Sequence, residues 1–187
     1  GASVVNALSS SFRAHIERNG KVYQQEFRRG VPTGEVEVIG DADKTGTTIT
    51  FLPDKKIFAT LDFDFNVLAQ RFREMTYLNK GVWIDFRDER RDRDTSFYFE
   101  GGIVSFCHQL NRRRVVIHSQ PIYVTKVVNG TTVEVALQYN EGFVESVFAF
   151  ANCINTIDGG THLTGFRTAL TRVLNDYARK NKVIKEN

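Results

Sequence analysis

Two Asn-Gly dipeptides, each lying between runs of alternating apolar and polar residues, constrain the fold of this chain most strongly. They are Asn19-Gly20 and Asn129-Gly130. Both residue types tolerate a positive φ, so Asn-Gly fits the two-residue turn of a β-hairpin better than most dipeptides. The sequence therefore predicts two antiparallel hairpins, whose strands are 12–18, 21–27, 122–128 and 132–139.

Other segments show the spacing of helices or further strands. Apolar residues recur at helical spacing in 65–78, 103–111 and 163–180, and Val4 opens a short apolar helical pattern. Runs rich in β-branched residues predict strands at 35–39, 47–51, 82–86 and 144–154. The charge-dense stretch 87–95 is expected to be a solvated hairpin tip, and a basic turn that faces DNA is the alternative. On the last helix we expect one buried stripe, formed by Phe166, Leu170, Val173, Leu174 and Tyr177.

These elements predict an α+β fold in two parts. The composition shifts at Glu100-Gly101-Gly102, which we take as the boundary between domains 1–99 and 100–187. The first domain is expected to be a layered α+β unit, and the second a three- or four-stranded sheet backed by two helices. A chain of 187 residues with 41% hydrophobic residues and 15 phenylalanines is long and apolar enough for such cores.

Charge and cysteine usage exclude several classes of protein. A net charge of +3 and a pI near 8.9 do not by themselves indicate nucleic-acid binding. Cys107 and Cys153 lie in apolar runs without zinc-site spacing, so both are expected to be buried and the chain is expected to bind no metal through them. No apolar run approaches the ~20 residues of a membrane span, and no signal-peptide pattern opens the sequence. We therefore expect a cytoplasmic protein without a membrane partner.

Two segments have residues suited to a nucleotide. Gly1-Ala2-Ser3 precedes a helix, and free amides at a helix start can hold phosphate. Lys44-Thr45-Gly46-Thr47 combines a tight turn with a hydroxyl at a strand edge. A simple helix start and a simple turn explain the same residues, so both interpretations stay open.

Two further segments have residues suited to phosphate. Gly159-Gly160-Thr161-His162 precedes a helix that carries Arg167, and Arg112-Arg113-Arg114 forms a short basic run near His118. A helix cap and solvated arginines are the alternatives. The sequence offers no nucleophile with an adjacent base and no carboxylate pair spaced for metal-assisted chemistry, so it predicts no catalytic residue and no metal ligand.

Five segments taken in order resemble the ATPase subunits of type IIA topoisomerases, the family of gyrase B and of the topoisomerase IV protein ParE. The segment 1–9 resembles the end of the ATP-lid motif of GHKL-type ATPases, and 44–51 resembles the strand beside the adenine. The other matching segments are 77–81, 99–103 and 158–167. The resemblance covers essentially the whole chain.

The resemblance implies a fold and an activity. Residues 1–99 would be the C-terminal part of a GHKL ATPase sandwich, and residues 100–187 most of a transducer domain with a fold like ribosomal protein S5 domain 2. In this family, ATP binding dimerises the protein and closes a gate on double-stranded DNA, and the transducer relays the closure to the cleavage core. The implied partners are DNA, a second copy, and gyrase A or ParC.

The resemblance also implies individual residue roles. Gly1, Ala2, Ser3, Thr47 and Ile49 would bind ATP, and Arg18 would lie at the rim of the pocket that coumarin inhibitors reach. Arg167 would face DNA, which suits a guanidinium because it attracts any phosphate backbone in a salt-dependent way.

The resemblance also marks what this stretch lacks. We expect the chain to begin inside a longer protein, because the family's base glutamate, metal-binding asparagine and adenine-binding aspartate would precede Gly1. Its γ-phosphate lysine would follow Asn187. ATP and Mg²⁺ would therefore be cofactors of the intact protein, would bind this stretch poorly, and would not be hydrolysed by it. The alternative hypothesis is a stand-alone basic DNA-binding module without nucleotide chemistry.

Overall fold

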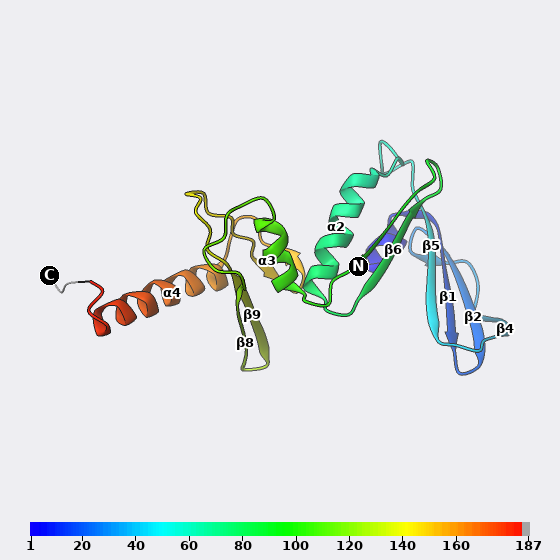
Figure 1. Cartoon of the computed structure of the whole chain (residues 1–187). Coiled ribbons are helices and arrows are strands. Elements are labelled where there is room, and N and C mark those ends of the chain that lie inside the picture. Colours follow the sequence, from blue (N-terminus) through cyan, green and yellow to red (C-terminus); the bar gives the residue numbers. More distant parts are fainter. Residues whose placement is uncertain (185–187) are drawn as a thin grey trace. The chain divides into compact units, whose positions relative to one another are not determined.

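The computed structural model describes residues 1–184, and the chain divides into two compact units, Gly1–Asp64 and Phe65–Asn187. Figure 1 shows the elements of each unit, which we describe separately. The predicted α+β class is confirmed, since helices and antiparallel strands alternate along the chain. The boundary between residues 99 and 100 stays a prediction.

The first unit is an antiparallel sheet with one short helix. Its sheet order is β3-β2-β1-β5, and β4 pairs with β2 as well. Asn19 and Gly20 adopt φ values of 54° and 74° between β1 and β2, so the predicted hairpin is confirmed. The elements of this unit are α1 (Ala2–Ala7), β1 (Ser9–Arg18), β2 (Lys21–Arg28), β3 (Val31–Pro32), β4 (Glu37–Asp41) and β5 (Gly46–Pro53).

The core of the first unit lies at the start of β1. Phe12 is 5% exposed and meets Phe27 edge to face, with 5.9 Å between ring centroids. Gly30 has a φ of +82°, and a Cβ there would approach the Ala7 backbone to 3.4 Å. Asp54, just after β5, is held by the Arg29 guanidinium and donates its own amide to the Leu8 carbonyl. These contacts hold α1 and the end of β5 beside the start of β1.

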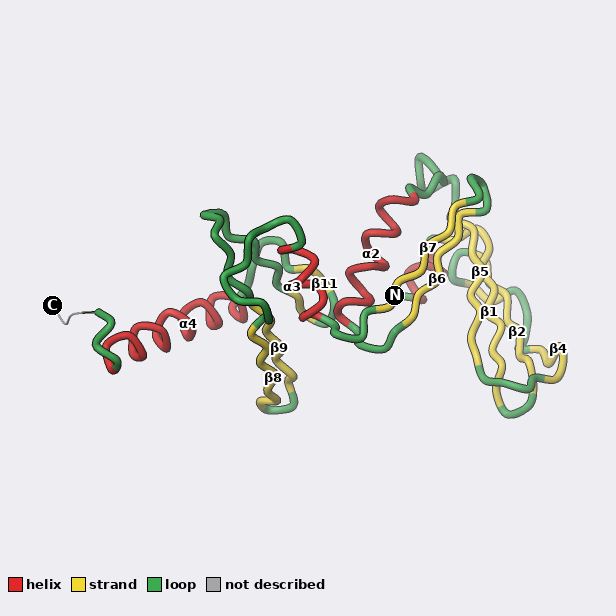
Figure 2. Tube along the Cα trace, viewed as in Figure 1, coloured by secondary structure: helices red, strands yellow, loops and turns green. Residues whose placement is uncertain are grey.

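The second unit is built from hairpins and helices (Figure 2). Within residues 65–184 the strands form three separate pairs, β6-β7, β8-β9 and β10-β11, so the larger sheet predicted for the second half is wrong. The elements are α2 (Phe65–Leu78), β6 (Trp83–Asp88), β7 (Arg93–Tyr98), α3 (Ile103–Asn111), β8 (Ile122–Val128), β9 (Thr131–Leu137), β10 (Phe150–Ala151), β11 (Ile154–Asn155) and α4 (Thr161–Lys180).

The predicted strand 144–154 is wrong. Strand pairing in this segment is limited to the two-residue strands β10 and β11, which pair with each other. Asn152 and Cys153 adopt φ values of 47° and 66°, so the chain reverses inside the predicted strand. The same turn exposes Cys153, so the expectation that this cysteine is buried is wrong, whereas Cys107 is half-buried.

Aromatic rings form the core of the second unit. Tyr77 is 4% exposed and stacks on Phe99 with 3.8 Å between centroids and on Phe106 with 5.1 Å. Phe106 also meets Phe148 at 5.3 Å, which ties the segment before β10 to α3. This cluster positions the loops around α3.

The predicted buried stripe on the last helix is wrong. None of the described α4 side chains is buried, and Val173, Leu174 and Tyr177 are 59%, 49% and 65% exposed. An amphipathic stripe requires a partner to become buried, and no other described helix or strand packs extensively on this one. Among residues 1–184, no helix combines the length and apolar character that crossing a bilayer requires.

A polar network joins the end of α3 to the end of β9. The Asn111 amide donates to Gln138 Oε1 at 3.0 Å, and Asn140 donates to Asn111 Oδ1 at 2.9 Å. The Tyr139 amide donates to His118 Nε2 at 2.9 Å, and His118 Nδ1 lies 2.7 Å from the Gln120 carbonyl oxygen. The loop that follows Arg112-Arg113-Arg114 is therefore fixed at several points.

Candidate functional site

Three residues expected near a nucleotide share one face of the first unit's sheet. Thr47 pairs with Ile16, and Ile49 pairs with Ala14. Paired residues in an antiparallel ladder point to the same side, as do alternate residues along a strand. Arg18 is in the same alternation as Ile16 and therefore joins this face at the end of β1. Ile49 is 42% exposed, so the face is accessible within this unit.

The segment Gly1-Ala2-Ser3 lies at the start of α1, as expected. The Gly1 carbonyl accepts amide hydrogen bonds from Val4 at 3.0 Å and Val5 at 3.2 Å. A Cβ at Gly1 would have nothing within 4 Å, so its backbone is open to a bound group. Within residues 1–64, no hydrogen bond or ion pair joins this segment to Arg18, Thr47 or Ile49.

In the second unit Arg167 forms an ion pair. Its Nη2 atom donates to Glu145 Oε2 at 2.9 Å, and the two side chains are 52% and 68% exposed. Arg114, from the basic run after α3, donates to Ser146 Oγ at 3.1 Å. Two arginines from distant parts of the sequence therefore meet two adjacent residues of the segment before β10.

The segment that carries Glu145 is tied to its surroundings on its C-terminal side. The Thr156 amide and hydroxyl both donate to the Ala149 carbonyl, at 2.8 and 3.0 Å. A shallow hollow beside it is lined by Phe148, Thr156 and Arg167, among others. His162 Nε2 lies 3.3 Å from the Thr156 hydroxyl oxygen.

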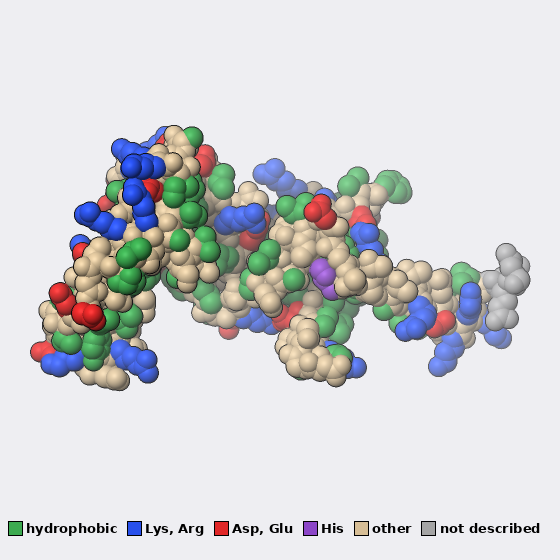
Figure 3. All heavy atoms as spheres, turned by 180° about the vertical axis from the view of Figure 1, so that it is seen from behind, with side chains coloured by type: hydrophobic (Ala, Val, Ile, Leu, Met, Phe, Trp, Pro, Cys, Tyr) green, Lys and Arg blue, Asp and Glu red, His purple; other side chains and the backbone are tan. Residues whose placement is uncertain are grey.

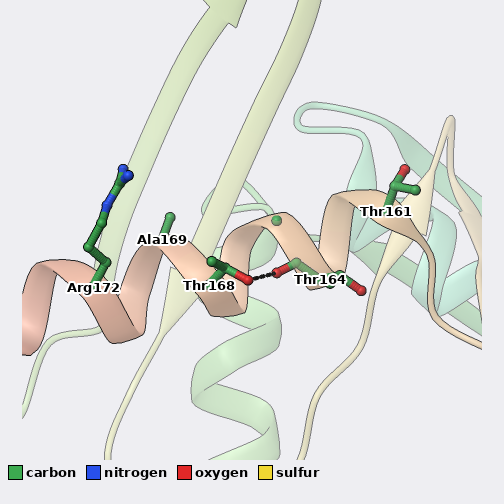
Figure 4. Close-up of a pocket in the computed structure, with 6 residues that line it drawn as sticks. Thr161, Thr164, Thr168, Ala169 and Arg172 are labelled. Atoms are coloured by element: carbon green, nitrogen blue, oxygen red, sulfur yellow. Dashed lines mark hydrogen bonds between the residues drawn. The ribbon is translucent and has the colours of Figure 1, made fainter.

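One exposed face of α4 is lined by Thr161, Thr164, Gly165, Thr168, Ala169 and Arg172. Figure 4 shows Ala169 and Arg172 on one side of the helix and the Thr168 hydroxyl bonded to the Thr164 carbonyl at 2.9 Å. Cations gather along α4 on the face seen in Figure 3. The charged residues of this helix are Arg167, Arg172, Asp176, Arg179 and Lys180.

Sequence reasoning identified the arginines but missed their partners Glu145 and Ser146. No local pattern marks an acidic residue as the partner of an arginine 22 positions later, the separation found here. Within the described residues, no cluster of His, Cys, Asp and Glu side chains could hold a metal ion. The first unit thus offers an open sheet face, and the second unit offers exposed arginines.

Comparison with known proteins gives consistent matches. The family profile described as DNA gyrase B matches residues 102–187. The chain is 49% identical to the DNA gyrase B protein of Clostridium acetobutylicum and 50% identical to that of Streptococcus pneumoniae. Both alignments cover 100% of this chain and 30% and 29% of the relatives. The chain thus spans less than a third of the length of these two relatives.

Solved structures agree with the sequence matches. The 43K ATPase domain of Thermus thermophilus gyrase B, in complex with an aminocoumarin, matches with a TM-score of 0.88 and 38% identity. That match covers 100% of this chain and 51% of the other. The B-subunit of the Myxococcus xanthus gyrase matches with a TM-score of 0.84 and 28% identity, over 91% of this chain and 51% of the other. The chain therefore belongs to the DNA gyrase B family, and it corresponds to part of the length of its members.

Proposed function

We propose that this chain is part of the ATP-driven subunit of a bacterial type II DNA topoisomerase of the gyrase type. In that role it would couple ATP binding and hydrolysis to the passage of one DNA duplex through another, and so to supercoiling. The observation that carries the proposal is 49% identity to a gyrase B protein over 100% of the chain. The fold supports it, because the whole chain superimposes on a gyrase B ATPase domain with a TM-score of 0.88.

The open sheet face of the first unit is proposed to hold part of the nucleotide. The Thr47 hydroxyl can hydrogen-bond a base or a water molecule, and Ile49 offers an apolar wall. Gly1, Ala2 and Ser3 are proposed to bind phosphate through the backbone at the start of α1. Arg18 is proposed to form the rim of the pocket that inhibitors reach; the solved Thermus gyrase B domain is a complex with an aminocoumarin. ATP hydrolysis with Mg²⁺ would supply the driving free energy.

The second unit is proposed to contact double-stranded DNA through Arg167. A half-exposed guanidinium on a helix with several cations can hold a phosphate without reading base sequence. In the cytoplasm, the intact protein is proposed to dimerise when ATP binds and to work with gyrase A or ParC.

The ATP role is tested by placing the sequence that precedes the matched region in the Clostridium acetobutylicum relative in front of this chain. We expect the fusion to bind ATP tightly, and the chain alone neither to bind it well nor to hydrolyse it. Thr47→Val should weaken ATP binding in the fusion, whereas the same change at Thr48, on the opposite face, should not. If the fusion bound no ATP while the chain alone bound DNA tightly, the stand-alone DNA-binding module would be the better description.

The DNA role is tested with a labelled mixed-sequence duplex titrated at several salt concentrations. Arg167→Gln should weaken binding and reduce the slope of log K against log salt by about 0.9, the value for one phosphate contact. Arg71→Gln is the matched control, because Arg71 lies on α2, has an exposed side chain and also pairs with a glutamate, Glu74. Equal slopes for both variants would contradict the assignment of Arg167.

A further inference from the structure

The carboxylate of Glu145 pairs with the guanidinium of Arg167, which is the group proposed to contact DNA. Arg167 Nη2 and Glu145 Oε2 are 2.9 Å apart, within the range of a charge-assisted hydrogen bond. A phosphate oxygen that takes the same N–H displaces the carboxylate, and one that binds another N–H of the guanidinium still shares its single positive charge with Glu145. The two anions therefore compete for one guanidinium.

Neighbouring contacts place Glu145 in this position. The next residue, Ser146, accepts a hydrogen bond from Arg114, and Phe148 packs on Phe106. On the N-terminal side, the Glu141 amide donates to the Val115 carbonyl at 3.0 Å. Glu145 thus lies between fixed points on both sides, although residues 142–149 form no strand.

The exposure of the pair makes the exchange feasible. Both side chains are more than half exposed, at 52% and 68%, so water screens their attraction and the pair is weak. DNA presents a dense array of phosphates and releases condensed counterions when a cation binds it, which a single carboxylate cannot match. Phosphate can therefore replace Glu145, at the cost of breaking the ion pair.

We propose that Glu145 is an internal competitor that holds Arg167 until a DNA phosphate takes its place, and that it thereby lowers the affinity of this surface for duplex DNA. This inference rests on the proposed DNA role of Arg167. Glu145 is thus a residue that sets affinity without touching DNA.

The test compares Glu145→Gln with Glu141→Gln. Both changes remove one negative charge from an exposed glutamate, but Glu141 has no ion pair among the described residues. Binding of the whole chain to a labelled mixed-sequence duplex is measured by fluorescence anisotropy at fixed salt. Glu145→Gln should tighten binding roughly twofold to fivefold more than Glu141→Gln, the range expected for an exposed pair.

Arg167→Gln separates the two proposals. In that background, Glu145→Gln should tighten binding no more than Glu141→Gln does. If Arg167→Gln weakens binding but Glu145→Gln and Glu141→Gln behave alike, the competitor proposal is overturned and the DNA role stands. If Arg167→Gln has no effect, the DNA role and the inference fail together. A larger fall in Tm for Glu145→Gln without gain in affinity would assign Glu145 a purely structural role and also overturn the proposal.

Discussion

The guanidinium of Arg29 donates a hydrogen bond to the buried carboxylate of Asp54, 25 residues further along the chain. Asp54 also accepts from the Lys56 amide at 3.0 Å and donates its own amide to the Leu8 carbonyl. The Arg29 hydrogen bond, followed by the Lys56 amide, lowers the pKa of Asp54 below its ordinary value. Through its carboxylate and its backbone amide, Asp54 thus joins the end of β5 to Arg29 and to Leu8.

This pair predicts how the stability of the first unit depends on pH. Because the folded pKa of Asp54 is lowered, its contribution is fully present above the unfolded carboxyl pKa of about 3.9 and is lost as pH falls through the folded pKa. Asp54→Asn should lower Tm near neutral pH. It should also make the free energy of unfolding fall less steeply as the pH is lowered. Urea unfolding across a pH series measures this. Asp41→Asn is the control, because Asp41 forms an exposed pair with Lys21, and this change should leave the decrease in stability at low pH unchanged.

The ring stack around Tyr77 predicts the most damaging truncation in the second unit. Tyr77→Ala removes a ring that is 4% exposed and stacked on Phe99 and Phe106, and should destabilise the unit by about 3–5 kcal/mol. Tyr177→Ala is the control, because that ring is 65% exposed and should change stability by less than about 0.5 kcal/mol. Denaturant unfolding monitored by fluorescence compares them. Equal losses would contradict the proposed core.

The first hairpin turn predicts a backbone effect. Gly20 has a φ of +74°, which costs other L-residues roughly 1–2 kcal/mol, so Gly20→Ala should destabilise the first unit by about that amount. Gly34→Ala is the matched control, since a Cβ there meets nothing within 4 Å and its φ is not positive. Thermal unfolding of the two variants measures the difference. A Gly34 variant as unstable as the Gly20 variant would refute the turn assignment.

The two cysteines should react at different rates. Cys153 is exposed at the turn between β10 and β11, whereas Cys107 is half-buried and burial raises the pKa of its thiol. A raised pKa means less thiolate, the reactive form, at neutral pH. Labelling with a maleimide should show a fast and a slow phase, and Cys153→Ser should remove the fast one. A single common rate in the parent chain would be inconsistent with this difference.

Local signals in the sequence predicted much of the fold. The Asn-Gly turns and the helices 65–78 and 103–111 are fixed by residues close together in sequence, and the structure contains all of them. The strand β7 was missed because its first residues, Arg93 and Asp94, are charged, whereas its pairing with β6 depends on partners such as Trp83. The 144–154 prediction failed because apolar content does not reveal a turn at Asn152 and Cys153.

The candidate site was predictable to a similar degree. Alternation along paired strands is sufficient to place Arg18, Thr47 and Ile49 on one face once the register is known. The Glu145–Arg167 pair depends on tertiary contacts around α3 and β10, which no short pattern encodes. The exposed stripe of α4 shows the same limit, because amphipathicity indicates that a helix needs a partner but does not identify one.

The two hydrogen bonds of His118 determine where its proton lies. The Tyr139 amide can only donate, so Nε2 must be the bare nitrogen, and Nδ1 must carry hydrogen toward the Gln120 carbonyl. An imidazolium has hydrogen on both nitrogens and could not accept the Tyr139 amide. The loop after the arginine run is therefore held to the end of β9 by one neutral tautomer of a single imidazole.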